Sequence, residues 1–145
     1  MPVPHNPFKA AITKGQLQLG CWLGLADPYI AEISAGAGFD WLLIDGEHAP
    51  NDLRSITAQL QVIGARGSHA MVRPPIGETW IIKQLLDAGA QSLLIPMVES
   101  GPQAQELVYA VTYPPHGVRG IGSALARASD FAAIGDYLTT AREEI

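Results

Sequence analysis

Two carboxylates and an imidazole follow one apolar run in the first third of the chain. Residues 41–44 are all apolar, and Asp45, Glu47 and His48 come directly after them. An apolar run without alternation predicts a strand buried on both faces, as in a parallel sheet covered by helices. In open α/β sheets and in (β/α)₈ barrels, ligands bind at the carboxyl ends of the strands. The spacing therefore predicts a functional site after this strand, with a solvated polar loop as the alternative.

The residue types at this strand end suit proton transfer beside an anion. The imidazole of His48 exchanges protons near neutral pH, and a neighbouring carboxylate would orient it. Arg73 follows another apolar stretch, and a guanidinium binds a carboxylate through two parallel hydrogen bonds. Such an arginine can hold a 2-oxo acid and stabilise its enolate, although a surface arginine would fit the same position. The sequence leaves two interpretations for Glu47 and Glu99: each could lie near a metal ion, or each could be a solvated loop residue.

Composition predicts one folded domain without a nucleic-acid surface. The chain has 145 residues, of which 48% are hydrophobic, so it is long and apolar enough for a core. Its net charge is −5 and its basic residues are scattered, which argues against a nucleic-acid partner. Cys21 is the only cysteine, which excludes a disulfide framework and favours a reducing compartment. No apolar run suits a membrane span and no signal peptide is recognisable, so we expect a cytoplasmic protein.

Periodicity and capping signals predict alternating strands and helices. Strands are expected at 18–23, 41–44, 69–72 and 92–95. Asn6 and Asp27 each precede a proline, which is typical of a helix N-cap. Helices are expected at about 7–14, 28–35, 52–63, 79–88, 102–111 and 134–141. No hairpin signal interrupts this alternation, so the sequence predicts an α/β fold with a parallel sheet.

The strand spacing is compatible with a (β/α)₈ TIM barrel. Steps of 23, 28 and 23 residues separate Cys21, Ile44, Val72 and Ile95, against about 31 residues per unit in a typical barrel. A doubly wound sheet has similar spacing, but polar loops after three strands favour a barrel with one shared pocket. Residues 1–145 would then be the N-terminal part of a single barrel domain, supplying roughly its first four βα units. Half a barrel leaves its edges unpaired, so either the sequence stops short of its domain or a partner completes it.

Several longer segments resemble one enzyme family. The segments are AGAGFDWLLIDGEHAP at 35–50, VRP at 72–74, KQLLD at 83–87 and RGIGSALARA at 119–128. They are similar to the class II pyruvate aldolases of the 4-hydroxy-2-oxoheptanedioate aldolase family, also called the HpcH/HpaI aldolases. The resemblance covers the chain from about Phe8 onward. It implies a TIM-barrel lyase of aromatic-compound catabolism that cleaves a 4-hydroxy-2-oxo acid reversibly to pyruvate and an aldehyde.

The resemblance also implies roles for individual residues. His48 matches the family's catalytic base, and Arg73 matches its pyruvate-binding and charge-stabilising arginine. Asp87 matches the carboxylate that raises the basicity of the histidine, and Asp45 an acid near the metal-bound water. A divalent ion (Mg²⁺, Mn²⁺ or Co²⁺) is implied for the complete enzyme, with family ligands beyond Ile145 and none within this chain.

The implied partners are a small 2-oxo acid and further copies of the chain, since the complete family forms hexamers. No nucleic-acid or membrane partner is expected. Asp87 has a plainer interpretation as an acid at a helix end, where the helix dipole disfavours it. The alternative for the whole chain is a non-catalytic half barrel, a fragment or assembly module without the metal site.

Overall fold

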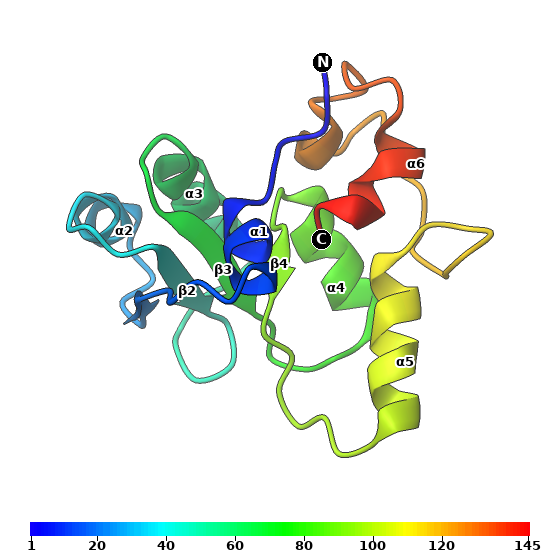
Figure 1. The fold of residues 1–145 in the computed structure, drawn as a ribbon. Coiled ribbons are helices and arrows are strands. Elements are labelled where there is room, and N and C mark those ends of the chain that lie inside the picture. The colour runs from blue at the N-terminus through cyan, green and yellow to red at the C-terminus, as the bar shows by residue number, and fades with distance from the viewer.

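The computed structural model describes residues 1–145 and contains one parallel sheet (Figure 1). Its strands are β1 (Gly20–Leu23), β2 (Trp41–Asp45), β3 (His69–Arg73) and β4 (Ser92–Leu93). They are neighbours in sequence order, β1-β2-β3-β4, and every pair is parallel. The prediction of a parallel α/β sheet is therefore confirmed.

Helices connect the strands and carry the predicted caps. They are α1 (Pro7–Thr13), α2 (Pro28–Ala35), α3 (Leu53–Gly64), α4 (Thr79–Asp87), α5 (Gly101–Val111) and the short α6 (Tyr137–Thr140), with 3₁₀ turns at Arg127–Ser129 and Ala141–Glu143. The side chains of Asn6, Asp27 and Asp52 each accept backbone N–H bonds at a helix start. Polar caps satisfy N–H groups that have no partner within the helix, which fixes where each helix begins. None of these helices is long and apolar enough to cross a membrane.

Three predicted elements are shorter than expected. β1 begins at Gly20 rather than at residue 18, because the backbone of Leu19 already pairs with Asp40. β4 ends at Leu93 instead of residue 95, and the chain turns away at Met97, whose φ is 57°. The helix expected at 134–141 is reduced to α6, because glycine at 135 weakens a helix start and Asp136 becomes the cap residue.

The core lies between the sheet and the helices that follow its strands. β2 is its centre, because residues 42–44 are fully buried. Alternate strand residues face the helices, and the buried cluster comprises mainly Leu42, Ile44 and Val72 from the strands with Ile56, Leu60, Ile63, Ile81 and Leu85 from α3 and α4. Each such side chain contributes about 2–3 kcal/mol when removed from water. This core holds the ends of β2 and β3 rigidly beside each other.

The amino ends of the strands are covered by the first and last segments of the chain. Phe8 of α1 stacks on the ring of His69 with ring centroids 5.8 Å apart. Asn6 donates to Ser92 Oγ at 3.1 Å, and its backbone N–H donates to Glu144 at 2.6 Å. Lys9 Nζ donates to the backbone carbonyl of Ile145 at 2.8 Å. The amino edge of the sheet is thus closed, whereas the carboxyl edge carries the predicted polar residues.

Candidate functional site

Asp45 and Arg73 meet at the carboxyl edge of the sheet. Each is the last residue of its strand, and the two are register partners in the β2–β3 pair. Arg73 Nε donates to Asp45 Oδ1 at 2.9 Å, and Arg73 Nη2 donates to Asp45 Oδ2 at 2.8 Å. This bidentate geometry fixes the plane of the guanidinium. The expectation that polar groups after neighbouring strands face one place is confirmed for this pair.

The loop after β2 folds back over the same arginine. Asp45 Oδ1 accepts the backbone N–H groups of Glu47 at 3.0 Å and His48 at 3.3 Å. This turn places Glu47 Oε2 2.8 Å from Arg73 Nη1. Gly46 permits the close approach, because a Cβ there would lie 2.8 Å from the carbonyl oxygen of Arg73. The open question about Glu47 is therefore answered in part, since it is neither isolated nor freely solvated.

The charges in this cluster stabilise one another. The hydrogen bonds from Arg73 hold the pKa of Asp45 well below its usual range, despite the burial of the carboxylate. Asp45 in turn raises the pKa of Arg73. Both groups therefore remain charged near neutral pH, and the site offers a permanently oriented cation.

Two further side chains border the guanidinium. The Arg73 guanidinium carbon lies 5.2 Å from the centre of the Trp22 ring, within cation–π range. His48 Nε2 lies 3.6 Å from Glu47 Oε1, and the His48 side chain is 75% exposed. The contact of Trp22 with Arg73 could not be predicted from the sequence, because it depends on how β1 and β3 flank β2. Together these residues provide an oriented cation, an aromatic wall and an accessible imidazole.

Asp87 is not part of this cluster. It is the last residue of α4, which starts near the carboxyl end of β3 and runs back for about 12 Å along its axis. Its partner is Arg119, whose Nη2 lies 2.7 Å from Asp87 Oδ1. Glu99 is also separate, since its backbone N–H donates to Gln103. The structure thus brings together Asp45, Glu47, His48 and Arg73, and leaves Asp87 toward the amino ends of the strands, where the chain leads from α4 to β4.

The residues of this chain do not form a metal centre by themselves. No group of three or more His, Cys, Asp or Glu side chains is arranged to hold a metal ion. The carboxylates of Asp45 and Glu47 are both bound to Arg73. A metal ion taking either carboxylate would have to compete with that cation.

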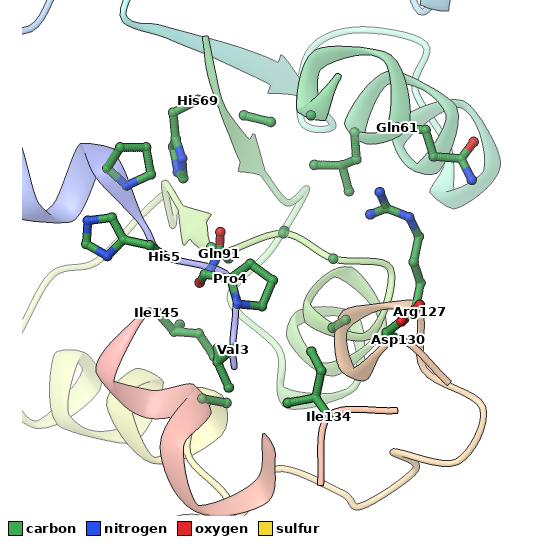
Figure 2. Close-up of a pocket in the computed structure, with 18 of the residues that line it drawn as sticks. Val3, Pro4, His5, Gln61, His69, Gln91, Arg127, Asp130, Ile134 and Ile145 are labelled. Carbon is green, nitrogen blue, oxygen red and sulfur yellow. The ribbon is translucent and has the colours of Figure 1, made fainter. Parts of the chain in front are cut away.

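A cavity of about 670 Å³ lies at the amino edge of the sheet, away from this cluster (Figure 2). Its lining includes His5, His69, Gln91, Arg127 and Ile145. Two of its polar side chains have partners within the chain, since His69 bonds to Ser92 and Arg127 donates to the backbone of residue 88. Burial also lowers the pKa of His69 to about 4, so its ring is neutral. These contacts make His69 a structural residue, stacked on Phe8 and bonded to Ser92.

The chain matches known proteins over almost its whole length. The family model for HpcH/HpaI aldolase/citrate lyase matches residues 18–142. A hydroxypyruvate/pyruvate aldolase from Roseovarius nubinhibens is 63% identical over 145 residues, covering 100% of this chain and 56% of the relative. The protein of that name from Deinococcus radiodurans is 63% identical over 140 residues, covering 97% of this chain and 50% of the relative. The chain therefore spans about half the length of these curated relatives.

Solved structures agree with this match. An HpcH/HpaI aldolase/citrate lyase family protein from Burkholderia cenocepacia superposes with a TM-score of 0.91 at 39% identity, covering 97% of this chain and 57% of the other. An HpcH/HpaI aldolase from Desulfitobacterium hafniense gives a TM-score of 0.85 at 31% identity, covering 98% and 55%. The parallel α/β fold is thus that of TIM-barrel aldolases, of which this chain corresponds to about half.

Proposed function

Because the chain belongs to the HpcH/HpaI aldolase/citrate lyase family, we propose that it forms part of an enzyme that cleaves 4-hydroxy-2-oxo acids reversibly to pyruvate and an aldehyde. Residues 1–145 would be the N-terminal part of one TIM-barrel domain. The observation that carries this proposal is the cluster of Arg73, Asp45 and His48 at the carboxyl edge of the sheet. Cleavage of a 2-oxo acid needs a fixed cation and a proton acceptor that both face the bound substrate.

Arg73 binds the anion in this proposal. As the bond between C3 and C4 breaks, its electron pair moves into the pyruvate enolate, and negative charge grows on the 2-oxo oxygen. A preorganised guanidinium stabilises that charge without having to reorient during the reaction. Asp45 keeps the guanidinium in place through two hydrogen bonds.

His48 carries the proton. It takes the proton of the 4-hydroxyl group, whose O–H electron pair becomes the second bond of the aldehyde carbonyl. A proton delivered to C3 of the enolate then gives pyruvate. The exposed imidazole can meet a substrate that lies over Arg73.

The divalent metal ion implied by the family requires ligands from outside this cluster. The carboxylates of Asp45 and Glu47 already bind Arg73, and no three or more His, Cys, Asp or Glu side chains are grouped to hold a metal ion. We propose that its ligands follow Ile145 in the complete polypeptide. The choice among Mg²⁺, Mn²⁺ and Co²⁺ rests with those residues.

Asp87 fits its proposed role only across two copies of the chain. Within one copy it lies at the far end of α4 and binds Arg119. If Asp87 raises the basicity of a histidine, that histidine belongs to another copy of the chain in a homo-oligomer. We propose that this oligomer is cytoplasmic. Mixing inactive His48→Ala and Asp87→Ala subunits should then restore part of the activity, whereas sites contained in one copy would give no recovery.

Pyruvate release from a 4-hydroxy-2-oxo acid tests the proposed function. We expect the full-length protein to release pyruvate, and His48→Ala to lower kcat and flatten its dependence on pH near neutrality. Arg73 stays in place in this variant, so KM for the 2-oxo acid should change less than kcat. No release in the presence of any of the three metal ions would favour the non-catalytic alternative.

A further inference from the structure

The guanidinium of Arg73 is fully engaged by carboxylates of its own chain. Asp45 occupies the edge formed by Nε and Nη2, with distances of 2.9 and 2.8 Å. Glu47 occupies Nη1 at 2.8 Å. A guanidinium has only two edges that can bind a carboxylate in bidentate fashion. A substrate carboxylate therefore reaches the second edge, Nη1 and Nη2, only if Glu47 moves.

The two carboxylates are held with unequal strength. Asp45 accepts two backbone N–H groups in addition to its two bonds from Arg73, and its side chain is 7% exposed. Glu47 contacts Arg73 through one oxygen and has no backbone donor to its carboxylate. Its second oxygen lies 3.6 Å from His48 Nε2, beyond hydrogen-bond distance. Glu47 is thus the replaceable partner and Asp45 the fixed one.

We propose that Glu47 is a resting counter-ion of Arg73, which an anionic oxygen of the 2-oxo acid displaces from Nη1. This inference rests on the proposed function and deepens it. Glu47 lowers the affinity of the site for anions, because every bound anion must first break the Glu47–Arg73 ion pair. Arg73 keeps its orientation during the exchange, since Asp45 holds the other edge.

Displacement also gives Glu47 a second position. Its carboxylate is already beside the imidazole of His48. Once released from Arg73, it stabilises the imidazolium that forms when His48 takes the hydroxyl proton. Glu47 is therefore a positioning residue that exchanges one cation for another when substrate binds.

Calorimetric titration of the full-length protein with pyruvate, at constant metal concentration, tests this inference. Glu47→Gln keeps the shape of the side chain and removes its charge, so we expect pyruvate to bind about fivefold more tightly. The neutral analogue pyruvamide should show no such gain. Glu99→Gln is the matched control, because it removes the same charge from the loop after β4 without contacting Arg73.

Several outcomes would overturn the inference. Unchanged or weaker pyruvate binding by both Glu47→Gln and Glu47→Ala, with normal thermal unfolding, would contradict the exchange. An equal gain for pyruvamide or for Glu99→Gln would also contradict it, because the effect would then not depend on Arg73. Arg73→Gln separates the two proposals: wild-type pyruvate affinity in this variant would overturn the proposed function itself.

Discussion

The two edges of the sheet carry the same kinds of side chain in opposite surroundings. Both edges carry arginine, aspartate and histidine side chains, among them Arg73, Asp45 and His48 at the carboxyl edge and Arg119, Asp87 and His69 toward the amino edge. At the carboxyl edge the His48 side chain is 75% exposed. At the amino edge His69 is only 8% exposed and is covered by Phe8.

The two arginines differ in what surrounds them. Arg73 binds carboxylates through all its nitrogens and keeps 19% of its side chain exposed. Arg119 is fully buried, with its guanidinium carbon 4.4 Å from the ring centre of Tyr113 and 5.8 Å from that of Tyr137. Only one of its nitrogens binds a carboxylate, and Nε and Nη1 have no protein partner. Residue type alone therefore does not identify a functional site. The solvent exposure of the side chain and the hydrogen-bond partners of its guanidinium distinguish Arg73 from Arg119.

The largest expected effect concerns stability at the amino edge. Arg119→Ala should lower the free energy of unfolding by about 3–5 kcal/mol, because it leaves Asp87 unpaired and removes a buried side chain that packs beside the rings of Tyr113 and Tyr137. Urea unfolding monitored by circular dichroism would measure the loss. Arg73→Lys should cost less than about 1 kcal/mol in the same assay, because that site remains partly solvated. Equal losses of unfolding free energy in the two variants would contradict the view that Arg119 stabilises the fold more than Arg73 does.

The next effect concerns activity at the carboxyl edge. Arg73→Lys should lower kcat/KM by about 10²-fold, or ~3 kcal/mol, since an ammonium cannot supply two parallel hydrogen bonds. Initial rates of pyruvate release by the full-length protein would show this. Arg66→Lys is the control, because Arg66 forms an exposed ion pair with Glu32. If Arg73→Lys kept near-normal kcat/KM with an unchanged fold, Arg73 would be a structural strand-end residue.

The smallest effect is a pH dependence from His69. Burial lowers the pKa of His69 to about 4 in the folded protein, against about 6.5 in an unfolded chain. The unfolded state therefore binds more protons between these values, and stability falls as the pH falls. The expected loss in unfolding free energy between pH 7 and pH 5 is about 2 kcal/mol.

Paired histidine variants test the origin of that pH dependence. His69→Gln should remove this part of the pH dependence. His48→Ala should keep it, because the exposed imidazole of His48 is not buried by folding. If His48→Ala were instead the variant that removed the pH dependence of stability, that dependence would arise at the carboxyl edge and not from the buried His69.

The sequence predicted the carboxyl edge better than the amino edge. The apolar runs located β2 and β3, and two strands that end together bring Asp45 and Arg73 into contact by register alone. The capping residues Asn6 and Asp27 were likewise evident, because capping is a local interaction. Local signals were thus sufficient wherever the geometry depends on neighbouring residues.

Contacts that depend on tertiary packing were not predictable. The Asp87–Arg119 pair joins residues 32 positions apart, with β4, α5 and the connecting loops between them. The contact of Glu47 with Arg73 depends on a turn whose bonds converge on one oxygen of Asp45. The short β4 and α6 follow from the path of the chain around Met97 and Asp136, which periodicity does not describe.

The most direct test of the central claim is to observe which arginine senses a 2-oxo acid. In the full-length protein, the Nε–Hε signals of the arginines can be assigned with Arg73→Lys and Arg119→Lys variants and followed by NMR during pyruvate titration. We expect the Arg73 signal to move with pyruvate concentration, while those of the buried Arg119 and of Arg127 at the amino-edge cavity stay unchanged. A saturable shift of Arg127 or Arg119 with no change at Arg73 would contradict the assignment of function to the carboxyl edge.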